Sequence, residues 1–288
     1  MIIMKFGGTS VANSEAISRT IGIIRGRLDQ KPVVVVSALS KVTDLLYRIS
    51  DKASERDESG ASELLSELRT RHMDLTKQLL SGSPELYGQA CAKVGELCGA
   101  LEGFVSAVCS LGELSDRSKA RIISTGEYLS STIICYAMNA GGIDTAFIDA
   151  RKMMVTSDDY LKGEPLTDEI TARVPGVVED AYQGKDAVIT QGFVSATLKG
   201  EPAVLGRGGS DYSASLIGMA VGAEKIEIWT DVDGVRTADP RVVKNTKSID
   251  RISFEEAAEM AHFGAKVLHP LTICLLYTSP SPRDSTSS

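Results

Sequence analysis

A lysine and a pair of glycines near the start of the chain are the first residues whose types and spacing indicate chemistry. Lys5 stands near the end of an apolar run, and Gly7 and Gly8 follow that run directly. Glycines at the end of a strand let backbone N–H groups approach an anion, and a following helix points the positive end of its dipole there. The lysine adds a mobile positive charge. The pattern favours a phosphate site, for example for a nucleotide, although a simple tight turn uses the same glycines.

A second glycine-rich segment, 205–212, reads Leu-Gly-Arg-Gly-Gly-Ser-Asp-Tyr. It fits neither the Walker A pattern nor the dinucleotide-binding fingerprint. The guanidinium of Arg207 has the forked geometry that suits a carboxylate, and Ser210 or Asp211 can cap the helix expected after the loop. The alternative interpretation is purely structural, with Asp211 as a helix cap and Arg207 as a surface charge.

Two further segments carry polar residues at the ends of predicted elements. Thr230 and Asp231 end a predicted strand, and α/β proteins bind ligands at the carboxyl ends of their strands. The spacing of Asp231, Asp233 and Gly234 differs from that of a calcium loop, which places its glycine at the sixth position and ends in glutamate. Lys266 and His269 follow a predicted helix, and alone they would be a surface charge and a capping or core histidine.

The elements that must position these residues alternate between strands and helices, which predicts an α/β fold with a mostly parallel sheet. Strands are expected at 2–6, 33–37, 145–148, 187–191, 203–205 and 225–230. A helix is expected at 14–28, a second begins at 212, and a third begins at a capping box formed by 253–256. Residues 42 to about 140 are expected to be mostly helical, with breaks at 57–60 and 81–84.

Composition narrows the range of functions. The chain has 288 residues, of which 43% are hydrophobic, and a formal net charge of −7, which argues against nucleic-acid binding. No uninterrupted apolar run approaches the roughly 20 residues of a membrane helix, so no membrane partner is expected. The 5 cysteines form no C-x-x-C pair, which favours reduced thiols and a cytoplasmic location.

Residues 274–288 change abruptly to Ser, Pro and Thr without hydrophobic periodicity. They are interpreted as a non-native tail, similar to a translated sequencing adapter, and a natural disordered tail is the alternative. The expected domain is therefore 1–273, with the natural polypeptide continuing past Ile273.

Taken together and in this order, the motifs resemble those of the aspartokinases, within the amino-acid kinase superfamily. The matching strings cover the chain from residue 2 to 273 and stand at 5–10, 37–38, 124–127, 192–193, 206–211, 229–234, 239–241 and 263–270. The resemblance implies a three-layer α/β/α sandwich. It also implies ATP-dependent phosphorylation of the side-chain carboxylate of L-aspartate to 4-phospho-L-aspartate, the entry to lysine, threonine and methionine synthesis.

The resemblance also implies roles for single residues. Lys5 and Asp211 would be catalytic, with Lys5 on the transferring phosphoryl group and Asp211 orienting the cationic groups around it. The residues that would bind aspartate are Ser37, Thr43, Glu127, Arg207 and Ser210. Those that would bind ATP are Lys5, Gly7, Gly8, Thr9, Thr230, Asp231, Arg236, Arg241, Lys266 and Val267. Mg²⁺ would bridge the β- and γ-phosphates, and no protein metal ligand is predicted.

Two departures from the family pattern leave alternatives open. Arg236 stands where some members have a tyrosine near the nucleotide, and no regulatory domain of the ACT type or fused homoserine dehydrogenase follows. A homodimer would normally form through those missing regulatory domains. The alternatives are a kinase with another carboxylate acceptor, a non-catalytic nucleotide- or amino-acid-binding regulator, and an inactive truncated fragment.

Overall fold

The centre of the molecule is a five-stranded sheet in which every strand runs parallel to its neighbours. The computed structural model describes residues 1–206, 208–231, 234, 236–238, 243, 245–253, 256–257 and 259–260. The sheet has the order β3-β5-β2-β1-β8, with β1 (Ile2–Phe6), β2 (Pro32–Val36), β3 (Thr145–Ile148), β5 (Ala187–Gln191) and β8 (Lys225–Trp229). Because the strands are parallel, their carboxyl ends share one edge of the sheet.

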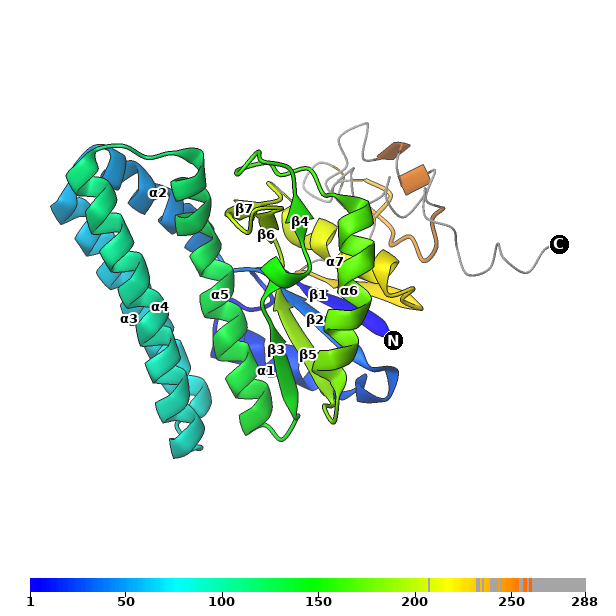
Figure 1. Cartoon of the computed structure of the whole chain (residues 1–288). Coiled ribbons are helices and arrows are strands. Elements are labelled where there is room, and N and C mark those ends of the chain that lie inside the picture. Colours follow the sequence, from blue (N-terminus) through cyan, green and yellow to red (C-terminus); the bar gives the residue numbers. More distant parts are fainter. Residues whose placement is uncertain are drawn as a thin grey trace.

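The two faces of this sheet are buried by different helices, as the alternation of side chains along a strand requires. Ile2, Met4 and Phe6 pack in a core with α1 (Ser14–Arg25) and α5 (Asp116–Ala140). Ile3 belongs to the opposite core, with α6 (Thr167–Tyr182) and α7 (Gly209–Ala220). The arrangement confirms the predicted three-layer α/β/α sandwich with a parallel sheet (Figure 1).

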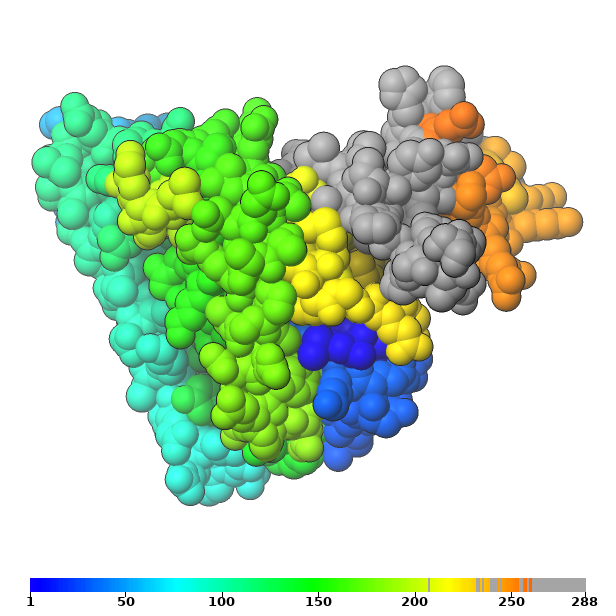
Figure 2. Space-filling model, turned by 45° about the vertical axis from the view of Figure 1, so that its right-hand side comes forward, coloured from blue at the N-terminus to red at the C-terminus, as the bar shows by residue number. Residues whose placement is uncertain are grey.

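The predicted helical stretch is a unit of its own built onto α5. It contains α2 (Val42–Ser54), α3 (Glu58–Leu80) and α4 (Pro84–Leu111). The break at 81–83 falls within the predicted 81–84, whereas the first break is at 55–57 and residues 58–60 of the predicted break 57–60 are helical. Helices α2 and α4 both pack against α5, and α3 packs against α4. Figure 2 shows α3 and α4 (cyan) along one flank, beside the green surface of the residues that follow them.

Among the described residues, α4 is long and apolar enough, by length and composition alone, to cross a membrane. Core helices of soluble proteins pass the same criterion. Here Val94, Leu101 and Val105 are buried within the core that α3 and α5 share, while Lys93 and Glu96 form an exposed ion pair. The helix therefore has an apolar side and a charged side.

Several elements were not expected from the sequence. Strands β4 (Val155–Thr156), β6 (Val194–Thr197) and β7 (Pro202–Val204) form a small second sheet, of which only β7 was expected. Short 3-10 helices span Leu28–Gln30 and Ala150–Lys152, and α6 was not predicted. The capping box is confirmed, because the Ser253 amide donates to Glu256 Oε2 at 2.9 Å and the Glu256 amide donates to Ser253 Oγ at 3.1 Å.

Candidate active site

An ion pair joins the first strand to the second glycine-rich loop, across more than 200 residues of sequence. Lys5 Nζ lies 2.6 Å from Asp211 Oδ1, and both side chains are largely buried, with exposed fractions of 11% and 19%. The contact is an ion pair rather than a well-aligned hydrogen bond, since Asp211 Oδ1 has no hydrogen-bond partner among the described residues. The structure therefore brings together the two residues that were predicted to be catalytic.

The pair lies in a pocket of about 370 Å³ at the carboxyl edge of the sheet. This pocket also brings together predicted site residues from four separate segments: Gly8, Ser37, Thr43, Glu127 and Ser210. It is further lined by residues that sequence reasoning did not assign to the site: Ala38, Leu39, Ser40, Lys41, Asp44, Phe193, Gly206, Gly208 and Gly209. Five of these belong to strings that match the aspartokinases, namely Ala38, Phe193, Gly206, Gly208 and Gly209, whereas Leu39, Ser40, Lys41 and Asp44 carried no such signal.

The second glycine-rich loop uses glycine for backbone geometry. Gly206 and Gly208 have φ angles of +75° and +76°, which are unfavourable for residues with a Cβ. Gly208 is the cap of α7, so neither Ser210 nor Asp211 caps that helix, and the structural interpretation of Asp211 as a helix cap is wrong. Instead, Ser210 and Asp211 lie in the first turn and line the pocket. The positive end of the α7 dipole therefore lies beside the pocket.

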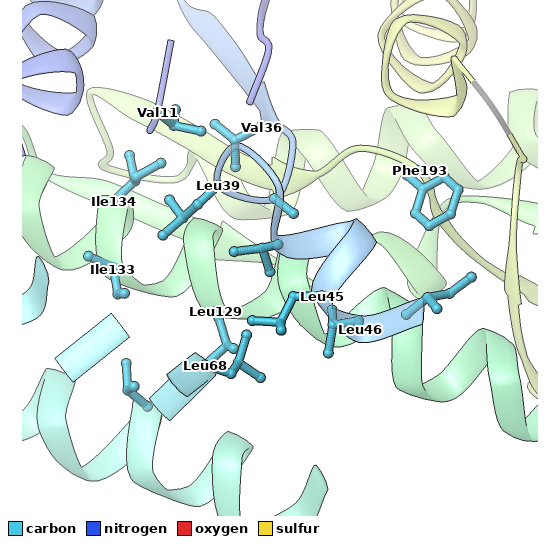
Figure 3. Packing of buried hydrophobic residues seen from close by; sticks show 14 of the residues in the cluster. Val11, Val36, Leu39, Leu45, Leu46, Leu68, Leu129, Ile133, Ile134 and Phe193 are labelled. Carbon is cyan, nitrogen blue, oxygen red and sulfur yellow. The ribbon is translucent and has the colours of Figure 1, made fainter. Parts of the chain in front are cut away.

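Residues 37–41 form the opposite wall and are fixed from several sides. Leu39 is 1% exposed and packs in the core with Leu45 and Leu46 of α2 (Figure 3). The Ser40 amide donates to the Gly8 carbonyl at 3.1 Å, which connects this wall to the first glycine loop. Arg71 of α3 donates to the Ser40 carbonyl at 2.9 Å. The wall thus rests on the helical unit as well as on the sheet.

Glu127 of α5 presents a buried carboxylate to the pocket. It is 3% exposed, and its Oε2 atom has no hydrogen-bond partner among the described residues. Burial raises the pKa of this carboxyl to about 8, and interaction with the Ala38 backbone amide offsets only part of that effect. A buried carboxylate with a free oxygen favours a cationic partner, such as an ammonium group.

Of the predicted nucleotide residues, those at the ends of β1 and β8 lie side by side. Phe6 pairs with Trp229 in the sheet register, and their rings stack with centroids 6.1 Å apart. The Gly7 amide donates to the Trp229 carbonyl at 3.2 Å, so that amide is engaged within the protein rather than free to hold a phosphate. Gly8 lines the pocket, and exposed Thr9 follows it.

Thr230 and Asp231 come directly after β8, both are exposed, and Thr230 Oγ1 donates to Asp231 Oδ1 at 3.0 Å. Arg236 donates to Thr246 Oγ1 at 3.1 Å. Arg207, Arg241, Lys266 and Val267 lie outside the described residues, as does the predicted tail 274–288. The assignment of all these residues to a ligand remains a prediction.

A profile of the amino acid kinase family matches residues 1–279. The chain belongs to the amino acid kinase family. One relative is the bifunctional aspartokinase/homoserine dehydrogenase 1 of Zea mays, which is 34% identical over 94% of this chain and 29% of that protein. Another is the aspartokinase of Chlamydia muridarum, which is 36% identical over 93% of this chain and 56% of that protein.

Among solved structures of this amino acid kinase group, the chain resembles Escherichia coli aspartokinase III in complex with aspartate and ADP. The TM-score is 0.86 at 32% identity, over 97% of this chain and 60% of that one. The chain therefore spans between 29% and 60% of the length of these relatives.

Proposed function

We propose that this amino acid kinase chain transfers the γ-phosphoryl group of ATP to the side-chain carboxylate of L-aspartate. The observation that carries the proposal is one pocket that holds both the Lys5–Asp211 ion pair and the buried, partly unpartnered carboxylate of Glu127. The first suits an anionic phosphoryl group and the second suits the ammonium of an amino acid. Similarity to proteins named aspartokinase, one of them solved with aspartate and ADP, supports this choice of acceptor.

In the proposed reaction an oxygen of the aspartate carboxylate forms a bond to the γ-phosphorus, and the bond from that phosphorus to the leaving oxygen of ADP breaks. The acceptor is ionised at neutral pH, so no general base is required. Lys5 stabilises the charge on the transferring group, with Asp211 fixing the position of the ammonium. The first turn of α7, with Ser210, directs a positive dipole end toward the same region.

The acceptor would be held on the side of the pocket formed by residues 37–43 and α5. Glu127 would bind the α-ammonium, while Ser37 and Thr43 offer hydroxyl groups for a carboxylate. Arg207, whose placement is not described, is assigned to the α-carboxylate on the sequence pattern alone. ATP would extend from Lys5 toward Thr230 and Asp231, and further to Arg236, Arg241, Lys266 and Val267.

Mg²⁺ is proposed to enter with ATP, where it would neutralise phosphate charge. Such an ion keeps several waters and takes one or two carboxylates in addition to phosphate oxygens. Asp211 is a carboxylate of suitable chemistry in the pocket, so it is the group that we expect nearest to the ion. The described part of the chain holds no cluster of three or more His, Cys, Asp or Glu that would bind a metal by itself.

Proposals about the whole protein rest on its relatives, since the chain spans only part of their length. We propose that the pathway is lysine, threonine and methionine synthesis, that the location is cytoplasmic, and that a homodimer forms through regulatory domains outside this chain. The four described cysteines are free thiols, which agrees with a reducing compartment.

The proposal is tested by aspartate-dependent release of ADP from Mg-ATP, with L-glutamate and N-acetyl-L-glutamate as competing acceptors. Release with aspartate alone would support the proposal. Release only with another carboxylate would identify a different amino acid kinase. Binding of aspartate and ATP without release, in a folded chain, would favour a non-catalytic role or an inactive fragment.

A further inference from the structure

Lys41 lines the pocket and has an unfavourable backbone conformation. Its φ and ψ angles are +66° and +1°, in the left-handed region that residues with a Cβ rarely occupy. At Gly206 and Gly208, on the facing wall, the chain meets similar φ angles with glycine. Position 41 therefore keeps a long cationic side chain where glycine would be the favourable residue.

Packing explains the backbone angle at this position but not the residue type. Leu39 and Val42, on either side, are 1% and 0% exposed, so both point into the core and the chain must turn between them (Figure 3 shows Leu39 and, in α2, Leu45). Lys41 itself is exposed. Across the described ranges its ammonium has neither an ion pair nor a hydrogen bond, so no internal contact offsets the unfavourable angle.

The charges of the pocket show what this ammonium could bind. The cationic side chains on the described lining are Lys5 and Lys41, and Lys5 is already paired with Asp211. Lys41 lies in the same wall as Ser37 and Thr43, the predicted acceptor contacts, and not beside the end of β8. Its position therefore favours an anion of the acceptor over an anion of the nucleotide.

We propose that Lys41 binds a carboxylate of the acceptor amino acid and thereby contributes to selection of a dicarboxylic acceptor. The proposal rests on the proposed function, because it presumes that the pocket takes an acidic amino acid. An exposed cation on a mobile stem in the pocket lining would attract the second carboxylate that distinguishes such an acceptor from neutral amino acids.

The test is calorimetric titration of L-aspartate into the chain in the presence of Mg²⁺ and a non-hydrolysable ATP analogue. We expect Lys41→Met, which keeps the Cβ and most of the stem, to raise the Kd for aspartate roughly fivefold. Lys41→Gly should raise it by a similar factor, and Lys41→Arg should largely preserve it. The Kd of the ATP analogue should stay unchanged in all three variants.

Lys31→Gly is the matched control, because Lys31 is an exposed lysine with a φ angle of +50° that does not line the pocket. Both glycine substitutions should raise the midpoint of thermal unfolding, and only the one at position 41 should weaken aspartate binding. An unchanged aspartate Kd in Lys41→Met and Lys41→Gly would overturn the assignment of Lys41 alone. Absence of aspartate binding by the unsubstituted chain would overturn the proposed function with it.

Discussion

At the scale of single residues, the buried carboxyl of Glu127 connects ligand binding to stability. Its pKa is raised to about 8 from an ordinary 4.5, so the folded protein binds a proton that the unfolded chain releases between these values. The folded state therefore loses stability as the pH rises from 4.5 to 8. By linkage, the stability lost between pH 4.5 and pH 7 is on the order of 3 kcal/mol in the absence of a cation.

We expect Glu127→Gln to stabilise the ligand-free protein at pH 8 and to abolish measurable aspartate binding, because the amide keeps the shape and removes the charge. Urea unfolding at pH 6.5 and pH 8 measures the first effect, and calorimetric titration measures the second. Glu96→Gln, at an exposed carboxyl, is the control and should change neither. If the free energy of unfolding depended on pH equally in Glu127→Gln and in the parent chain, the raised pKa of Glu127 would be contradicted.

Lys5 is expected to act on turnover more than on acceptor binding. Lys5→Met should lower the rate of ADP release by at least about a hundredfold, since charge stabilisation in the transition state is lost. The Kd for aspartate should change little in comparison. Because the substitution leaves Asp211 buried without its partner, thermal unfolding of Lys5→Met must show that the variant is folded before lost turnover is assigned to catalysis. Turnover of Lys5→Met near that of the parent chain would contradict the catalytic role of Lys5.

His72, on α3, gives a second and opposite dependence on pH. It is fully buried, its Nδ1 contacts the Leu68 carbonyl at 2.7 Å, and its Nε2 has no partner among the described residues. Burial lowers its pKa to about 4 from 6.5, so the neutral form is stabilised. Neutral His72 contributes fully to the free energy of unfolding above pH 6.5. This contribution should be lost as the pH falls from 6.5 toward 4, by up to about 3 kcal/mol. His72→Leu should flatten urea-unfolding stability over this range.

At the scale of elements, the close approach of α5 to residues 37–46 places Glu127 beside the pocket wall. A Cβ on Gly126 would lie 2.9 Å from Ala38 Cβ and 3.0 Å from Val42 Cγ1, closer than such atoms approach. Gly126→Ala should therefore destabilise the fold and weaken aspartate binding, although alanine favours helices. Gly103→Ala in α4, where nothing lies within 4 Å, should instead stabilise by up to about 1 kcal/mol. Thermal unfolding and aspartate titration of both variants provide the comparison.

The elements that the sequence predicted are those with strong local signals. The β-branched run of β2 and the glycines after β1 predicted a buried strand and a loop, and both are present. Strand β4 has 2 residues, too short to show a period, and the pairing of β4 with β6 depends on tertiary contacts. Helix α6 contains Pro175, which interrupts a helical pattern in sequence.

In the candidate site, too, local sequence signals predicted the residues, whereas tertiary contacts determine how they meet. The glycine-rich loops and Glu127 could be chosen from residue types and motifs, but their meeting in one pocket depends on the strand order of the sheet. Engagement of the Gly7 amide by Trp229 could not be predicted, because it depends on the register of β1 and β8. The positive φ of Lys41 likewise follows from burial of its neighbours and has no local sequence signal.

At the scale of the whole molecule, the kinase unit is expected to be independent of residues 274–288. We expect a chain of residues 1–273 to unfold at the same temperature as the full chain and to bind aspartate with the same affinity. Differential scanning calorimetry and titration of both chains measure this. A markedly lower unfolding temperature for residues 1–273 would contradict the interpretation of 274–288 as a non-native tail.

The stacking of Phe6 on Trp229 has a practical consequence. The chain has 1 tryptophan, and its carbonyl accepts the Gly7 amide at the end of the first glycine loop, while its indole N–H donates to Glu227 Oε2 at 3.0 Å. All tryptophan emission from the protein therefore originates beside the proposed nucleotide site. Intrinsic fluorescence can consequently report occupancy of that site directly, in unlabelled protein, while the tyrosines elsewhere contribute only at shorter wavelengths.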